Sequence, residues 1–481
     1  MQGKDNPTRA LLISGATVID GVSDLPIKRQ SILIEGQRIK AIGKREELDV
    51  PPHAVVIDAD GKYVIPGLMN ANVHLIIARL ESLVRYEGQY EDLILEAAQV
   101  ALKNGLTTVF DTWGPRKPLM LVRDRINAGE LLGSRVFCGG NIIGLDGPFS
   151  LDFGGGKGLG VLSRGLMRRI NALYVENVGP ELTWMTPEDV ALELRAYIGR
   201  GVDLIKYSSS EHRWMENEAT ASILFSAEAQ AAMVNEAHAA GITAQAHTSA
   251  VEGLRVAVEA GCDLIQHCNI TGPVRIPGKT IDLMVQKKTG AVVFPLTKRR
   301  FDWVMQTNPP EARRFFSTVN DNCRHLIQAG AKLMLGSDGN ILPPDVREDP
   351  ATQRFWMAPG EDNLADLGQG HFAWLKAMEE MGLPAMEGLR AATLNIAVAY
   401  GKDEDLGSLE PGKLGDLLIL DKDPLRASEN YRSIKMIIKG GAVVDHDSLP
   451  VNPILTQPAV APDEIVASYG RFALSNFPFC C

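Results

Sequence analysis

The sequence predicts an α/β protein built around a (β/α)8 barrel, with β-rich segments near both ends of the chain. Eight short apolar runs alternate with helical patterns through the middle of the 481 residues. Eight strand-then-helix units over roughly 250 residues or more are what a β/α barrel needs. The composition, 45% hydrophobic and 22% charged, is that of a globular chain long enough for a large core and a second, smaller unit.

Short strand patterns come first, separated by turn residues such as Glu35-Gly36 and Asp60-Gly61. Apolar runs bounded by such turns are typical of strands. The five predicted strands span residues 11–13, 16–19, 31–34, 39–42 and 54–58. A similar texture returns at residues 407–421 and 434–441, which predicts a small β unit at each end of the chain.

The barrel strands follow in order. The first ends at His74, and the other seven cover residues 107–110, 135–138, 204–206, 243–247, 264–267, 291–294 and 332–336. Segments between them, such as residues 226–240, favour helix. Residues 145–185 are rich in glycine and lack a clear period, so we expect a mobile loop over the barrel mouth. The proline-rich tail from residue 449 is expected to form an arm or a packed extension.

The charge pattern argues against nucleic acid and membrane as partners. The formal net charge is −10, from 59 acidic and 49 basic side chains that are scattered without a long run of either sign. Residues 1–7 lack the apolar core of a signal peptide, and no stretch approaches a bilayer-spanning length without charge, so we expect a cytoplasmic protein. The cysteines show neither disulfide nor zinc-finger spacing and are expected to be inert thiols.

The most informative motif is the run from Val64 to His74, an apolar strand that passes Pro66-Gly67 and ends in Asn72-Val73-His74. Successive residues of a strand face opposite sides, so the side chains at positions 72 and 74 point the same way and can reach one ion. Imidazole is a good ligand for a zinc-like ion, whereas a neutral amide oxygen is a poorer one. The asparagine therefore bears on mechanism.

Four more polar residues end or follow barrel strands. His247 and His267 terminate consecutive strand patterns 20 residues apart. One such histidine is more often structural, but two at successive strand ends fit a metal site at the C-terminal face of a barrel. Lys206 ends the fourth strand, where an isolated lysine is usually a solvated charge. Asp338 follows the eighth strand before Gly339, and Asp-Gly is also an ordinary turn signal.

Together these positions resemble the ligand set of the metal-dependent amidohydrolase superfamily, over about residues 11–441. The resemblance implies that Lys206 is carboxylated by carbon dioxide into an anionic bridging ligand. His247 and His267 match the histidines of the fifth and sixth strands, and Asp338 matches the aspartate that binds metal and acts as general base and then general acid. The implied domains are a TIM-type barrel at residues 66–401, a β-sandwich built from residues 1–65 and 402–455, and a tail at residues 456–481. Relatives of this kind usually form homo-oligomers.

The superfamily has a histidine where this chain has Asn72. The resemblance implies two metal sites. The first is formed by positions 72 and 74 with Lys206 and Asp338, and the second by Lys206, His247 and His267. Because Asn72 weakens only the former, we predict one tightly held divalent ion, Zn²⁺ in preference to Co²⁺ or Mn²⁺. The ion would activate water for hydrolysis without a covalent intermediate.

The Asn-x-His motif resembles a small group of amidohydrolases that cleave herbicides, the phenylurea hydrolases (B type) and the thiocarbamate (molinate) hydrolases. This resemblance implies hydrolysis of a C–N bond in a small neutral N-methylated phenylurea or carbamate, of the diuron or linuron type, giving an aniline and a carbamic acid. Thiocarbamate hydrolysis is the first alternative. A dipeptidase for Xaa-Pro or other acyl-amino acids and a non-catalytic amidohydrolase-like scaffold are the others.

An apolar aromatic substrate calls for an aromatic pocket. His212, in the loop after the fourth strand, is a further candidate for substrate contact. The aromatic candidates follow strand ends or lie in the glycine-rich segment: Trp113, Phe149, Phe153, Tyr207 and Trp214. Basic residues after strand patterns keep the dipeptidase alternative open, since a basic group can hold a terminal carboxylate: Arg116, Arg213, Lys298, Arg299 and Arg300.

Overall fold

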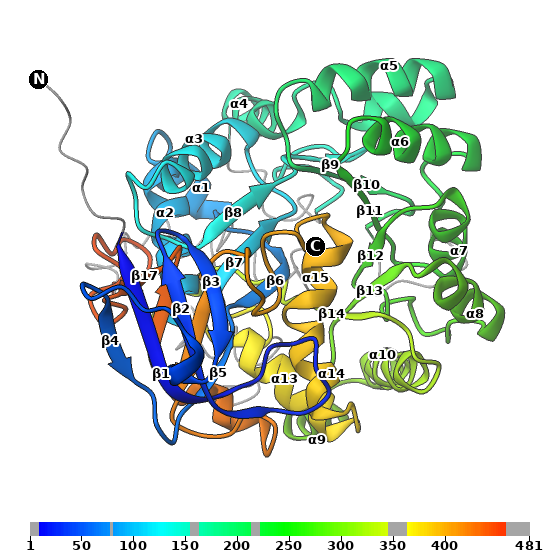
Figure 1. Cartoon of the computed structure of the whole chain (residues 1–481). Coiled ribbons are helices and arrows are strands. Elements are labelled where there is room, and N and C mark those ends of the chain that lie inside the picture. Colours follow the sequence, from blue (N-terminus) through cyan, green and yellow to red (C-terminus); the bar gives the residue numbers. More distant parts are fainter. Residues whose placement is uncertain (1–8, 77–79, 154–162, 213–221, 345–362, 458–481) are drawn as a thin grey trace, which may run out of the picture.

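The fold is a parallel (β/α)8 barrel beside a mixed β-sheet, as predicted (Figure 1). It comes from a computed structural model that describes residues 9–76, 80–153, 163–212, 222–344 and 363–457. Among these residues, no helix is long and apolar enough to cross a bilayer.

All eight predicted barrel strands are present. The first three pair in parallel: β6 (Leu68–Val73), β7 (Leu106–Asp111) and β8 (Arg135–Cys138). Beyond the short β9 (Ile142–Ile143), the parallel order continues through β10 (Leu204–Ser208), β11 (Thr243–His247), β12 (Leu264–Gln266), β13 (Gly290–Val293) and β14 (Leu333–Leu335). A parallel bridge between Val73 and Gly339 joins the two ends, which closes the barrel.

Helices surround the barrel because each strand is followed by an amphipathic segment whose apolar side faces the strands. Figure 1 shows α5 to α8 and α10 outside strands β10 to β14. The helices of the first half are α1 (Leu80–Arg85), α2 (Tyr90–Lys103), α3 (Arg116–Asn127), α4 (Arg164–Val175), α5 (Pro187–Ile198), α6 (Ala227–Ala239) and α7 (Val251–Ala260). Those of the second half are α8 (Gly278–Lys287), α9 (Lys298–Thr307), α10 (Pro310–Gln328), α13 (Gly370–Glu380), α14 (Ala385–Ala391) and α15 (Leu394–Ala399).

One eight-stranded sheet combines both chain ends, and it corresponds to the β-sandwich of the prediction. Its amino-terminal strands are β1 (Ala10–Val18), β2 (Ile27–Glu35), β3 (Arg38–Gly43), β4 (Val55–Asp58) and β5 (Tyr63–Pro66). They are joined by β15 (Leu417–Leu420), β16 (Ile434–Lys439) and β17 (Ala442–Val444). The link is the antiparallel pairing of β5 with β15, in which Ile65 lies opposite Leu418. The domain boundaries themselves stay a prediction.

The expectation of a loop without secondary structure at residues 145–185 was wrong in part. The segment contains α4 and the 3-10 turn η3 (Pro180–Trp184). Helix α4 is capped by Ser163, whose hydroxyl accepts from the backbone N–H of Leu166, and it buries Ile170 and Tyr174. Leu166 and Met167, one turn earlier, also pack against the core, so apolar residues recur at helical spacing and the helix could have been predicted. Residues 154–162 of this segment lie outside the described residues.

The tail is a packed extension as far as residue 457. Helix α2 holds it through polar side chains, since Lys103 Nζ donates to the carbonyl of Leu449 at 2.7 Å. The buried carboxylate of Glu96 accepts from the backbone N–H of Leu455 at 2.8 Å and of Thr456 at 2.9 Å. These bonds fix the last described segment against the barrel.

Candidate active site

The six predicted metal ligands meet at the carboxyl ends of the barrel strands, and all six are buried. Asn72 lies on β6 and His74 directly follows it. Lys206 lies on β10 and is 0% exposed. The remaining three are the last residue of β11 and residues just beyond β12 and β14: His247, His267 and Asp338.

Two of these residues have a left-handed backbone. The φ angle is +37° at His267 and +52° at Asp338. Residues other than glycine rarely adopt this conformation, and the strain is commonly kept where a side chain has to be aimed. At both positions the chain turns just beyond the end of a strand. The turn directs the side chain over the end of the barrel.

The two later histidines face each other. His247 Nδ1 and His267 Nε2 are 2.9 Å apart. His267 Nδ1 is 3.0 Å from the carbonyl oxygen of Thr248, and since a carbonyl only accepts, Nδ1 carries the proton. This leaves His267 Nε2 as an acceptor that faces His247 Nδ1. A ring N–H bound to a backbone carbonyl is the usual support behind a metal-ligating histidine.

His74 and Asp338 form the second close pair, with His74 Nε2 at 3.1 Å from Asp338 Oδ1. The carbonyl oxygen of Asn72 accepts from the backbone N–H of Asp338 at 3.0 Å, which ties the end of β14 to β6. Burial lowers the pKa of His74, and it lowers the pKa values of His247 and His267 further. All three imidazoles are therefore neutral at pH 7, the form in which imidazole binds metal.

A hydrogen-bonded chain joins Asn72 to Lys206 through Thr112. The Thr112 hydroxyl donates to Asn72 Oδ1 at 2.6 Å and accepts from Lys206 Nζ at 3.1 Å. Asn72 Nδ2 is buried and has no partner within the described residues. The amide oxygen at position 72 thus already serves as an acceptor inside the protein.

The donor set fits a divalent ion only if the lysine contributes. No three His, Cys, Asp or Glu side chains of the described chain are grouped closely enough to hold one. The site instead offers two pairs, each separated by about 3 Å, with Lys206 buried beside them. At metal–nitrogen distances of about 2.0–2.1 Å, two ligand atoms of one tetrahedral ion lie roughly 3.3 Å apart. The 2.9 Å between His247 Nδ1 and His267 Nε2 is a little shorter than that spacing.

Aromatic rings form a continuous wall beside these residues. The ring of Trp113 meets His74 edge-on at 5.8 Å and stacks on Phe153 at 4.0 Å between centroids. The ring of His212 lies 5.1 Å from Phe153 and 4.9 Å from His247. Burial lowers the pKa of His212 to about 4. Trp113, Phe153 and His212 are therefore brought to the site.

Two other substrate-contact candidates are not brought there. Tyr207 follows Lys206 on β10, so it faces the outside of the barrel, where Cys262 adjoins its hydroxyl. The prediction that Tyr207 contacts the substrate is therefore wrong, because neighbouring residues of a strand face opposite sides and Lys206 faces the site. Trp214 lies outside the described residues.

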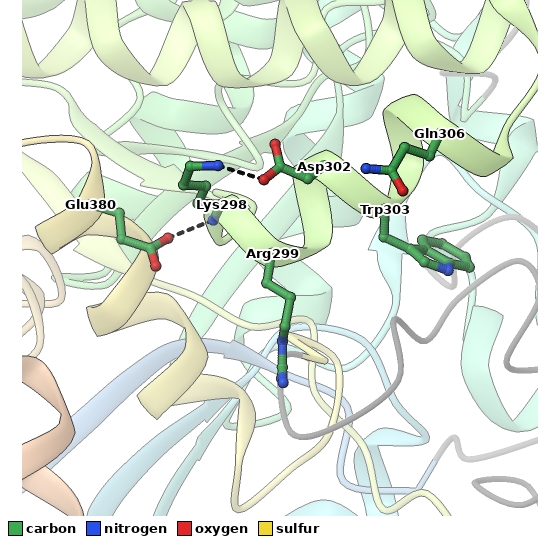
Figure 2. Close-up of a pocket in the computed structure, with 6 residues that line it drawn as sticks. All are labelled: Lys298, Arg299, Asp302, Trp303, Gln306 and Glu380. Carbon is green, nitrogen blue, oxygen red and sulfur yellow. Dashed lines mark hydrogen bonds and ion pairs between the residues drawn. The ribbon is translucent and has the colours of Figure 1, made fainter.

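The predicted basic residues that are described lie elsewhere or are paired. Arg116 binds Glu176 through Nε at 2.5 Å and Nη2 at 3.2 Å. Lys298 and Arg299 lie at the start of α9, on a separate pocket of about 450 Å³ that contains no predicted ligand. Figure 2 shows Lys298 Nζ bound to Asp302 and the Lys298 backbone N–H bound to Glu380. Arg300 is on the same helix, and Arg213 is outside the described residues.

Sequence reasoning missed Asp111 and Thr112, the polar residues at the end of β7. Asp111 is buried and accepts from the backbone N–H groups of Leu75 at 2.8 Å and Trp113 at 3.2 Å. Burial raises its pKa to about 7. The available signal was their position at the C-terminal end of a barrel strand, where functional side chains gather.

Comparison with known proteins identifies the family of this fold. A solved structure of molinate hydrolase matches with a TM-score of 0.88 and 35% identity, covering 95% of this chain and 99% of the other. For phenylurea hydrolase B the TM-score is 0.87 and the identity 35%, over 93% of this chain and 99% of the other. Imidazolonepropionase of Thermoplasma acidophilum is 24% identical over 440 residues, 87% of this chain and 90% of its own. The family model described as "Amidohydrolase family" matches residues 63–444, and the chain belongs to this family.

Proposed function

We propose that this chain hydrolyses the C–N bond between the carbonyl carbon and the aryl nitrogen of N-methylated phenylureas. The observation that carries the proposal is the aromatic wall of Trp113, Phe153 and His212 beside the predicted ligands. Flat apolar rings of this kind suit a neutral aryl group. The 35% identity to phenylurea hydrolase B over 93% of this chain supports the same substrate class.

The ion would be held by Lys206 in its carboxylated form, His247 and His267, with His74 and Asp338 adjacent. Carboxylation suits a lysine that is 0% exposed, because it removes a buried positive charge and supplies anionic oxygen atoms. A divalent ion in this place supplies Lewis-acid polarisation of a carbonyl group. The Thr112 hydroxyl fixes the lysine nitrogen and so orients the group attached to it.

Asp338 is the proposed acid–base residue. Its backbone N–H is bound to the Asn72 carbonyl and its Oδ1 lies 3.1 Å from His74 Nε2, so the carboxylate is held in place. It accepts a proton from the attacking water and delivers it to the departing aryl nitrogen. One water is consumed, the C–N bond breaks, and the products are an aniline and a carbamic acid that loses carbon dioxide.

We propose one tightly held ion per chain, Zn²⁺ in preference to Co²⁺ or Mn²⁺. The side-chain oxygen of Asn72 supports this number of ions. It already accepts a hydrogen bond of 2.6 Å from the Thr112 hydroxyl, and an amide oxygen is a weak ligand for such an ion. Metal analysis of protein purified without chelator should give one ion per chain at full activity. Two ions per chain would contradict the proposal.

Thiocarbamate hydrolysis is the second candidate, supported by 35% identity and a TM-score of 0.88 to molinate hydrolase. The dipeptidase alternative loses support because Arg116 and Lys298 are bound to Glu176 and Asp302. Turnover of diuron and linuron, compared with molinate and N-acyl prolines, separates the three.

Variants of the proposed ligands test whether the chemistry depends on this site. Lys206→Ala, His247→Ala and His267→Ala should each lose metal and nearly all turnover, while the fold is retained. If all three keep full turnover, the site assignment fails. If the wild-type protein binds no metal and turns over none of the compounds, the non-catalytic scaffold is the correct description.

A further inference from the structure

The His212 ring lies in the site although it occupies none of the predicted ligand positions. Its centroid is 4.9 Å from that of His247 and 5.1 Å from that of Phe153. The chain just before His212 is held by two contacts. Ser210 forms a bridge with Ile223, and the carbonyl of Glu211 accepts from the Ser249 hydroxyl. The ring is therefore presented by an anchored segment.

One hydrogen bond determines which nitrogen of His212 carries the proton. Nδ1 lies 3.1 Å from the backbone carbonyl oxygen of Asp152. A carbonyl oxygen can only accept, so Nδ1 is the donor, and the neutral ring keeps a lone pair on Nε2. The Asp152 backbone is itself held in a local turn, because its carboxylate accepts from the backbone N–H of Asp146 at 2.8 Å.

The remaining nitrogen is a buried acceptor that lacks a donor. Nε2 of His212 makes no hydrogen bond to any part of the protein that the structure describes. A buried polar atom without a partner carries a free-energy cost, and such atoms at active sites are commonly satisfied by a bound molecule. Because the ring touches His247 and Phe153, a molecule between the ligand set and the aromatic wall is within its reach.

We propose that His212 Nε2 accepts a hydrogen bond from an N–H of the substrate and thereby selects substrates that carry this N–H over fully N-substituted ones. This inference rests on the proposed function. An N′,N′-dimethyl phenylurea has one N–H, between the aryl ring and the carbonyl group, whereas an N,N-dialkyl thiocarbamate has none. The stacked rings of Phe153 and Trp113 adjoin His212, so the aryl ring and the neighbouring N–H contact adjacent parts of one surface.

The test uses a matched pair of ureas: a dimethyl chlorophenylurea and the same compound with a methyl group on the aryl nitrogen. Values of kcat/KM for both are measured with wild-type protein and three variants. His212→Phe keeps a ring but removes Nε2. His212→Gln keeps an acceptor, and His238→Phe makes the same change at an exposed histidine on α6 that pairs with Asp263. Comparing ratios removes the steric effect of the added methyl group, which all variants share.

The wild-type preference for the N–H compound should fall by about tenfold to a hundredfold in His212→Phe, the usual effect of losing a buried hydrogen bond. It should stay within about threefold in His212→Gln and be unchanged in His238→Phe. An unchanged ratio in His212→Phe overturns the inference. Loss of metal from His212→Phe also overturns it, since the same Nδ1 bond can support a metal ligand.

Failure of the proposed function has a separate signature. If the wild-type protein hydrolyses neither urea, equilibrium binding of the same two compounds to wild type and His212→Phe is measured by calorimetry. A preference for the N–H compound that disappears in His212→Phe supports the inference without the reaction. Equal binding of the two compounds, or binding of neither, overturns it.

Discussion

Replacing Thr112 by valine tests whether the connection between Asn72 and Lys206 matters. The substitution keeps the shape of the side chain but removes one bond of 2.6 Å and one of 3.1 Å. It leaves the buried amide of Asn72 without any side-chain partner in the described structure, since Nδ2 already has none. Two lost hydrogen bonds and an unsatisfied buried amide together correspond to about 2–4 kcal/mol of unfolding free energy.

The assay compares urea unfolding of the metal-free proteins and metal affinity against a competing chelator. Besides the loss of stability, Thr112→Val should weaken metal binding by about tenfold to a hundredfold, because the lysine nitrogen loses its acceptor. Thr108→Val on the same strand is the matched control, since the Thr108 hydroxyl is buried and has no partner among the described residues. That control should be neutral or slightly stabilising. If the two variants are equally stable and bind metal equally well, the reasoning is refuted.

Three further predictions follow from other residues. Asn72→His should raise the metal content of the loaded protein above one ion per chain, and an unchanged content would contradict the role given to Asn72. Glu96→Gln should cost about 1–3 kcal/mol and expose the chain near residue 455 to proteases, because the carboxylate accepts three hydrogen bonds there. Lys439→Met should raise stability at pH 7, because burial lowers the pKa of Lys439 to about 8 from 10.5. Below pH 8 the folded state bears the full cost of burying the Lys439 charge, at most about 3 kcal/mol. The cost fades as the pH rises toward 10. An equal gain in thermal midpoint for Lys439→Met at pH 7 and pH 10 would contradict this prediction.

The barrel could be predicted because its strands are short apolar runs in a regular order, and the positions of the ligands follow from strand ends. The alternation of strand faces also predicts that Tyr207 points away from the site once Lys206 points into it. Helix α4 could also have been predicted, because Leu166, Met167, Ile170 and Tyr174 recur at helical spacing.

The contacts within the site could not be read from the sequence. Thr112 and Lys206 are 94 residues apart, and neither the bond between them nor the one between His212 and Asp152 has a local pattern. The left-handed backbone at His267 and Asp338 occurs at residues other than glycine, so composition gives no indication of it. These features depend on how distant loops meet over the barrel.

The charge of the proposed site favours a neutral substrate. With Lys206 carboxylated, the ligands carry two negative charges, one from that group and one from Asp338, and three neutral imidazoles. One divalent ion balances them, whereas a second would leave a buried excess of positive charge. Asp111 is a buried carboxyl whose pKa is raised by burial, so it adds no positive charge to the surroundings. A substrate carboxylate would then lack a cationic side chain as partner, whereas a urea or carbamate needs none, so added negative charge on the substrate should weaken binding.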